Sequence, residues 1–308
     1  MRTIYFCLAM LLAVCLKSAA QEYNRFYLDS AFVSTDSGKH TYFRVISKDS
    51  MANWYRSKTY YKSGQLQEDV RSSTPKGGFY DGSKLQYWEN GNLKQKSEFI
   101  ERREMGQVQT WYENGKPQSI GQWEDASGTG SKHDFILSDF WDENGRQTVL
   151  NGKGRYSKSD KNFHEEGEIE NGLRSGIWTG RIFRYGLSFD ERYEKGEFVS
   201  GKSTDASNKR YEYSEIDEKP VFKNGTDAIS KYIAANFRNP SDKAQSGRML
   251  AMFTIAPSGK VREVVIKRSV GKNADAEAIR VVSGMPPWKP ARHRGMPVEK
   301  SMLMPIVI

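Results

Sequence analysis

Two patterns of apolar residues divide the chain. Over residues 23–213, short runs rich in aromatic residues end repeatedly at a glycine turn: YYKSGQL at 60–66, YWENGNL at 87–93, WYENGKP at 111–117 and a looser FWDENG at 140–145. Aromatic residues favour strands, and Asn-Gly is typical of type I′ hairpin turns, which need positive φ at both central residues. The pattern therefore predicts successive hairpins that form one long antiparallel meander.

From about residue 221 onward, the pattern mixes helices and strands. It first predicts a helix that has Ile229, Tyr232, Ile233 and Phe237 on one face. Two strands follow at 249–256 and 261–268, joined by a turn at 257–260. A second helix, with Ala278, Val281, Val282 and Met285 on its inner face, and a last strand at 298–308 complete the series. Thr226 and Asn273 are expected to cap the two helices. These elements predict an α+β domain with two helices and a three-stranded sheet.

Short sequence words mark the same region. They are Asn239-Pro240, Gly247-Arg248, Pro257-Ser258-Gly259-Lys260-Val261, Asp275-Ala276-Glu277-Ala278, Trp288-Lys289-Pro290 and Pro297-Val298. In this order and spacing they resemble the C-terminal domain of the TonB family. The resemblance implies a non-enzymatic periplasmic domain that grips short extended segments of outer-membrane transporters. The alternative is another small α+β domain with a three-stranded sheet.

The repeated phrase at residues 23–213 resembles the MORN-like repeats of the YwqK antitoxin family, and this resemblance implies only a fold, an all-β antiparallel repeat. The aromatic residues are expected to fill the core face of the sheet. The alternative is an exposed stripe that stacks on a ligand, in which case tryptophans such as Trp88, Trp111 and Trp178 would indicate glycan or peptide binding. Their exposure distinguishes the two interpretations.

The N-terminus has the pattern of a signal peptide. Arg2 precedes an apolar run at 4–16, and Lys17 is followed by the small residues Ser18-Ala19-Ala20. The run is shorter than the roughly 20 residues of a membrane-spanning helix, so we expect cleavage after Ala20. An uncleaved membrane anchor is the alternative. The only two cysteines, Cys7 and Cys15, both precede this site, so no disulfide is expected in the mature chain.

These patterns predict three parts: a signal peptide at 1–20, a MORN-like β-repeat domain at 21–213 and a TonB C-terminal-like domain at 214–308. The polar segment 201–218 is expected to be the linker between the two domains. Because the chain has no long proline-rich spacer like that of TonB, coupling to an inner-membrane energy source is not expected.

Charge and candidate chemistry argue against nucleic-acid binding and catalysis. The net charge is +9, but 47 basic and 38 acidic residues are interleaved, which favours a mixed solvated surface. One stretch, Gly196 to Ser203, fits the phosphate-loop pattern GxxxxGKS, but no helix is predicted after it, as a phosphate site requires. The four histidines lack metal-ligand spacing. We therefore predict no catalytic residue, cofactor or metal, and no enzyme.

The expected function is that of a periplasmic binding or adaptor protein in envelope transport. The TonB resemblance points to the last strand, where an extended partner segment would add to the sheet edge by β-augmentation. Pro305 favours an edge position, because proline cannot donate to a strand ladder. The candidate partner-binding residues are Val298, Lys300, Met302, Leu303, Met304 and Ile306.

The expected partner is an outer-membrane transporter or another envelope protein, and membrane association would arise through partners. One alternative is a repeat scaffold that binds glycan, peptidoglycan or protein, with a purely structural TonB-like domain. Another is a membrane-anchored TonB-type energy transducer, which requires an uncleaved N-terminus. The sequence leaves the oligomeric state open.

Overall fold

The computed structural model describes residues 24–48, 53–76, 79–125, 133–238 and 247–307. The predicted signal peptide lies outside these ranges. The chain divides into two compact units, residues 1–134 and 135–308. Of the helices within the described ranges, none combines the length and apolar character that a membrane span requires.

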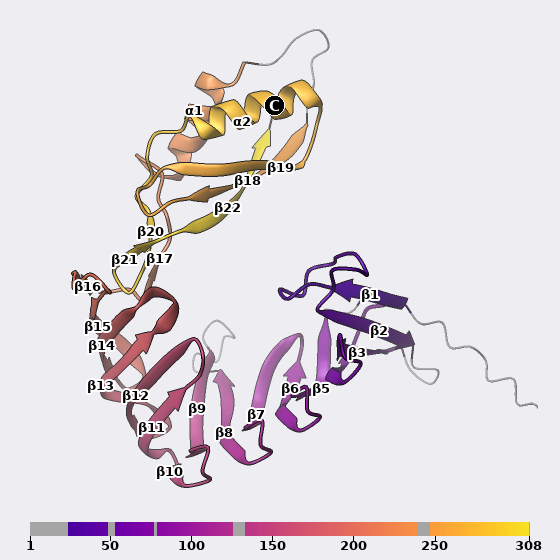
Figure 1. Cartoon of the computed structure of the whole chain (residues 1–308), viewed down its shortest axis with the longest axis vertical. Helices are drawn as coiled ribbons and strands as arrows, with labels where there is room; N and C mark the ends of the chain where they lie inside the picture. The colour runs from indigo at the N-terminus through magenta and orange to yellow at the C-terminus, as the bar shows by residue number, and fades with distance from the viewer. Residues whose placement is uncertain (1–23, 49–52, 77–78, 126–132, 239–246, 308) are drawn as a thin grey trace, which may run out of the picture. The chain divides into compact units, whose positions relative to one another are not determined.

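In the described residues, sixteen strands follow one another in chain order in an antiparallel sheet, without a crossover (Figure 1). The predicted meander is therefore confirmed. The first eight strands are β1 (Asn24–Leu28), β2 (Tyr42–Lys48), β3 (Tyr55–Tyr61), β4 (Leu66–Ser72), β5 (Tyr80–Tyr87), β6 (Leu93–Ile100), β7 (Arg103–Trp111) and β8 (Pro117–Asp125). The next eight are β9 (His133–Trp141), β10 (Gln147–Leu150), β11 (Lys153–Ser159), β12 (Phe163–Glu170), β13 (Leu173–Ile182), β14 (Leu187–Glu194), β15 (Glu197–Thr204) and β16 (Arg210–Tyr213).

The turns in the repeated phrase differ from the predicted type. The glycine alone takes up a left-handed conformation, with φ between +82° and +90° at Gly64, Gly91, Gly115 and Gly145. The preceding asparagine instead closes the turn through its side chain, since Asn90 Oδ1 accepts the N–H of Asn92 at 2.9 Å. A shift in strand register follows, as at Gln86/Tyr87, so a glycine bulge replaces the expected type I′ turn.

Two later Asn-Gly hairpin turns do have positive φ at both central residues. They are Asn151-Gly152, with φ of 51° and 74°, and Asn171-Gly172, with φ of 53° and 78°. The type I′ prediction is therefore right for these tight turns and wrong for the longer phrase.

The tryptophans named above are structural. Trp88 and Trp111 are half-buried, and the indole Nε1 of Trp88 donates to the backbone oxygen of Trp111 at 3.0 Å. Tyr61 makes a similar bond with its hydroxyl to the oxygen of Tyr87, at 2.9 Å. Trp178, in the second unit, is buried. Trp178 thus fills the core, as the first interpretation expected, whereas Tyr61 and Trp88 join one hairpin to the next and stay partly exposed.

In the second unit, aromatic rings cover glycines on the neighbouring strand. A Cβ built on Gly201 of β15 would lie 2.2 Å from the ring of Tyr213 on β16. A Cβ on Gly167 of β12 would lie 2.4 Å from the ring of Trp178. The missing side chains make room for large rings close to the backbone, a packing known to stabilise sheet glycines.

An α+β module follows the strand series. Its elements are β17 (Asp217–Glu218), α1 (Thr226–Asn236), β18 (Arg248–Ile255), β19 (Val261–Arg268), α2 (Lys272–Ser283), β20 (Ala291–His293), β21 (Met296–Val298) and β22 (Lys300–Val307). One sheet has the order β19-β18-β22 and a second, smaller sheet the order β17-β20-β21. Both helices lie on the same face of the first sheet (Figure 1), so the expected small α+β domain is confirmed.

The core of this module lies between the helices and the sheet. Met249 and Phe253 of β18 are buried against Ala278 and Val282 of α2, with Trp288 packed beside them. Glycines, and not the predicted capping residues, precede the two helices: Gly225 occupies the N-cap position before Thr226, and Gly271 the one before Lys272. Asn273 lies inside the second helix. The predicted side-chain caps are therefore wrong.

The segment expected to be a linker is largely strand. Residues 201–218 contain the end of β15, all of β16 and the short β17. The exposed polar residues that suggested a linker, such as Lys202 and Glu212, alternate with the buried residues Gly201, Ser203 and Tyr213. Polarity on one face of an antiparallel sheet thus resembled the composition of a loop.

Candidate functional site

The candidate binding strand, β22, lies at an edge of its sheet. Each of its residues from Lys300 to Val307 has a partner on β18, and no other described strand pairs with it. Pro305 lies opposite Leu250 within this ladder. A proline fits there because its nitrogen, which has no hydrogen to donate, faces away from the neighbouring strand. The far side of β22 is therefore an open row of backbone groups.

The six predicted residues do not share one environment. Met302, Met304 and Ile306 point toward the helices, and Ile306 is part of the core at 2% exposure. Leu303 points to the opposite face and is 56% exposed. Lys300 begins the strand and is exposed.

Val298 lies elsewhere than predicted. It belongs to β21 and pairs with Ala291 of β20 in the smaller sheet. The predicted strand 298–308 is broken at Glu299, so Val298 is not part of the edge that could accept a partner strand. Ile306 is a core residue, and at 2% exposure its side chain offers a partner little surface.

An apolar groove runs beside the edge strand. It has a volume of about 360 Å³ and lies between α1 and the end of β22. The lining side chains from α1 include Ile229, Ile233 and Phe237, and those from β22 include Met304 and Ile306. A strand added to β22 would direct every second side chain toward this groove, because side chains alternate between the two faces of a sheet.

A buried ion pair joins the end of the strand series to the α+β module. Arg294 Nε donates to Oε1 of Glu191 at 2.8 Å, and its guanidinium lies 4.0 Å from the ring centroid of Phe189. Glu191 is completely buried and also accepts hydrogen bonds from the hydroxyls of Tyr193, at 2.9 Å, and Tyr213, at 2.8 Å. Each carboxylate oxygen thus has donors, as a buried charge requires.

These contacts change the acidity of the two tyrosines. Burial raises the pKa of Tyr193 to about 12; Glu191 adds to this rise and Arg174 opposes it. Burial is also the main reason that the pKa of Tyr213 lies well above its usual value, and Glu191 again contributes. Both hydroxyls therefore stay protonated at neutral pH and act as hydrogen-bond donors.

This network was not predicted from the sequence. One signal was present in the strand that contains Glu191: every second residue of β14 is buried, and Leu187, Phe189, Glu191 and Tyr193 share that face. An acidic residue in a row of apolar ones indicates a buried partner. Nothing in the sequence pointed to Arg294, 103 positions later.

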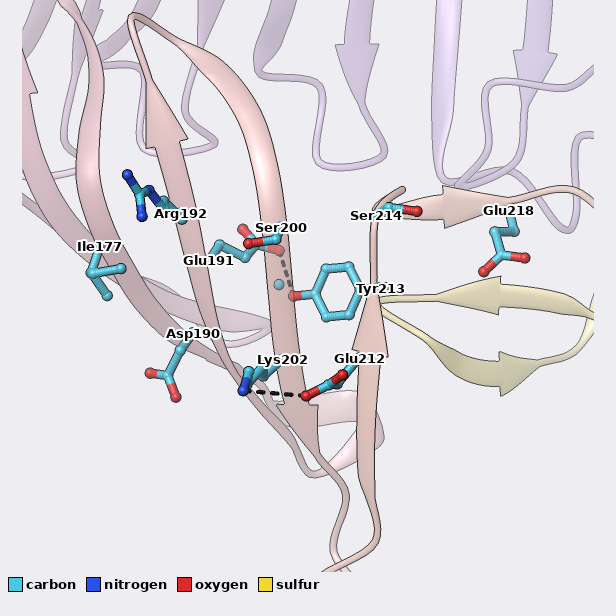
Figure 2. Close-up of a pocket in the computed structure, with 11 residues that line it drawn as sticks. Ile177, Asp190, Glu191, Arg192, Ser200, Lys202, Glu212, Tyr213, Ser214 and Glu218 are labelled. Atoms are coloured by element: carbon cyan, nitrogen blue, oxygen red, sulfur yellow. Dashed lines mark hydrogen bonds and ion pairs between the residues drawn. The ribbon is translucent and has the colours of Figure 1, made fainter.

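A cavity of about 670 Å³ opens near this network (Figure 2). Its lining alternates in charge: Asp190 and Glu212 flank Lys202, whose Nζ lies 3.2 Å from Oε1 of Glu212. Both members of this pair are largely exposed. The charged side chains thus form cross-strand pairs on a solvated sheet face, and Glu191 and Tyr213, whose hydroxyl donates to the carboxylate at 2.8 Å, line the same cavity.

The phosphate-loop match falls in this same sheet. Residues 197–204 form strand β15, and the next element is strand β16. A phosphate loop requires a glycine turn that enters a helix, so the local structure lacks that geometry. Across the described ranges, no group of three or more His, Cys, Asp or Glu residues is arranged to hold a metal ion.

Comparison with known proteins supports the C-terminal resemblance. Residues 241–307 match the family model "Gram-negative bacterial TonB protein C-terminal". The match covers β18, β19, α2 and β22 and begins after α1. No curated protein matches the chain. The match indicates a TonB-like domain that interacts with proteins of the Gram-negative envelope, while the MORN-like resemblance of the strand series stays a prediction.

Proposed function

We propose that this chain is a non-enzymatic binding protein of the cell envelope, and that its C-terminal domain holds an extended segment of a partner protein at β22. The observation that carries the proposal is an open edge strand within the segment that matches the TonB family model. Backbone hydrogen bonds to the free side of β22 would supply affinity, as in other complexes formed by strand addition. The partner would be an outer-membrane transporter or another envelope protein, and the chain would act as an adaptor.

The groove beside β22 indicates which side chains the partner segment should have. Alternate side chains of an added strand would pack on Ile233 and Phe237 of α1, so they should be apolar. The intervening side chains would point to the other face, as Leu303 does. We therefore expect a segment without internal prolines, in which apolar residues occur at every second position.

Titration of the full chain with a synthetic peptide tests the proposal. The peptide copies an extended periplasmic segment of a TonB-dependent transporter and matches the eight residues of β22 in length. Saturable binding is expected, with loss of binding when alternate peptide residues are replaced by proline. Equal binding of both peptides, or of neither, would contradict strand addition at this edge.

The location of the protein is a separate part of the proposal. Export with cleavage after Ala20 would yield a periplasmic chain that begins at Gln21. N-terminal sequencing of the chain recovered from cells decides this, and replacement of Ala20 by Asp should retain the precursor. Recovery of an intact N-terminus in the inner-membrane fraction would instead favour the anchored energy transducer.

A further inference from the structure

The sheet of the C-terminal domain has a second face, which points away from both helices and is apolar at its centre. Alternation along the three strands places six apolar side chains on it: Leu250, Met252, Val265, Leu303, Pro305 and Val307. Pro305 is exposed, as are Val265 at 46%, Leu303 at 56% and Val307 at 75%.

These apolar residues are contiguous across the sheet. Met252 on the central strand lies directly opposite Val265 on β19 and Leu303 on β22. Leu250, two residues earlier, lies on the same face. A connected, exposed apolar patch of this kind marks a surface that contacts another body.

Three arginines surround the patch. Arg248 lies opposite Val307, Arg268 opposite Leu250, and Arg262 opposite Thr254. All three are exposed, and within the described ranges none of them forms an ion pair. One acidic residue, Glu263, reaches the same face, where its Oε2 lies 3.4 Å from Oγ1 of Thr254. The face is therefore positively charged overall.

The surrounding domain is also basic. Residues 214–308 contain 16 basic and 9 acidic residues, a net charge of +7, whereas the whole chain has +9. Nearly all the net charge of the protein is thus in the C-terminal third. A positive domain attracts anionic surfaces over a Debye length of about 8 Å at physiological salt.

We propose that this face docks on the surface of an anionic lipid bilayer. The aliphatic side chains would enter the boundary between headgroups and acyl chains, and the three arginines would contact the anionic headgroups. The free backbone edge of β22 is not used in this contact. The inference is therefore independent of strand addition.

Two other occupants fit the face less well. A second copy of the same face would bring the arginines of both chains together, and like charges repel. A protein partner would have to supply acidic side chains for all three arginines, whereas an anionic bilayer presents negative charge over its whole surface. Charge thus favours lipid.

Vesicle flotation with residues 21–308, which retain every described residue, tests the proposal. The vesicles are phosphatidylcholine alone or phosphatidylcholine mixed with phosphatidylglycerol. Binding is expected only to the anionic vesicles and should weaken as salt is raised. Equal binding to both kinds of vesicle, or to neither, would overturn the proposal.

Matched variants locate the contact. The triple variant R248Q/R262Q/R268Q should bind anionic vesicles about a hundredfold more weakly, since each basic residue near such a surface contributes roughly fivefold. The control K223Q/K231Q/K272Q removes the same charge from exposed lysines outside this face and should lose much less. If both triple variants lose binding equally, net charge alone is responsible and the face is not the contact.

A second pair of variants tests the role of the apolar side chains on this face. V265D places an acid within the apolar patch, whereas I279D makes the same kind of change at an exposed position of α2, on the helical side. V265D should abolish vesicle binding and I279D should retain most of it. Circular dichroism confirms that each variant is folded. A folded V265D chain that binds as well as I279D would overturn the proposal.

Discussion

Arg294 donates two hydrogen bonds to Glu191, at 2.8 Å and 3.4 Å, across 103 residues of sequence. The backbone oxygen of Arg294 also accepts the hydroxyl of Ser203, at 2.7 Å. The loop between β20 and β21 is thereby fixed to strands β14 and β15 of the same compact unit. This contact makes the α+β module continuous with the end of the strand series, where a linker was expected.

Removal of the arginine should therefore destabilise the second unit strongly. Arg294→Ala leaves the Glu191 carboxylate buried without its cation, and breaking a buried pair in this way lowers the free energy of unfolding by about 3–5 kcal/mol. Urea unfolding followed by tryptophan fluorescence measures the change. The double variant E191M/R294M should recover only part of the loss, because it removes both charges but leaves the hydroxyls of Tyr193 and Tyr213 without their acceptor. If R294A is as stable as wild type, the ion pair does not fix the α+β module to the end of the strand series.

The glycines covered by aromatic rings make a second prediction. Gly201→Ala places a methyl group 2.2 Å from the ring of Tyr213, and such overpacking lowers the free energy of unfolding by about 1–3 kcal/mol. Gly38→Ala is the control, since nothing lies within 4 Å of its Cβ, and its effect should stay within about 0.5 kcal/mol. Thermal unfolding of both variants checks this. Equal melting temperatures would show that the sheet adapts to the methyl group.

Stability should fall at alkaline pH. The pKa of Tyr193 is about 12 in the folded chain and about 10 in the unfolded chain. Below pH 10 both states are protonated and the hydroxyl contributes its full stability. Between pH 10 and 12 only the unfolded state loses the proton, so the contribution is lost as pH rises.

Thermal unfolding at a series of pH values across this window measures the effect. Tyr193→Phe removes the titrating group, so its melting temperature should fall less between pH 10 and 12 than that of wild type. Tyr213, whose pKa is also raised, remains in this variant, and some alkaline loss should persist. A Y193F chain with the same pH dependence as wild type would mean that the buried hydroxyl does not govern alkaline stability.

Much of the fold could be predicted because it depends on local pattern. Strand alternation and turn glycines are visible within about ten residues, and they indicated the antiparallel meander and the small α+β domain. The turn geometry was harder to predict from the sequence. Asn90 closes its turn through its side chain, whereas Asn171 itself takes up positive φ, and the same Asn-Gly pair allows both.

The ion pair and the division of β22 into two faces depend on tertiary contacts. Glu191 and Arg294 are too far apart in sequence for any local pattern to connect them. The last strand was predicted from its apolar residues, but it is interrupted at Glu299, and Val298 belongs to another sheet. Alternation places Ile306 in the core and Leu303 on the exposed face. Which of the two faces is buried can be decided only when the position of the helices is known.

The edge strand gives the most direct test of the proposed function. Neighbouring residues on a strand direct their N–H groups to opposite edges. The absence of an N–H at Pro305 suits a position that faces away from β18, so Leu303, two residues earlier, should also direct its N–H to the open edge. Leu303→Pro would then remove one donor available to a partner and leave the β18 ladder intact.

Binding of the transporter peptide to L303P should weaken by about 1–3 kcal/mol, or roughly 5- to 150-fold, as measured by isothermal titration calorimetry. Leu303→Ser is the matched control, because it loses the side chain but keeps the N–H, and it should bind nearly as well as wild type. Met302→Pro removes an N–H that faces β18 and should unfold the domain, which circular dichroism would detect. A folded L303P chain with wild-type affinity would mean that the partner does not pair with the backbone of β22.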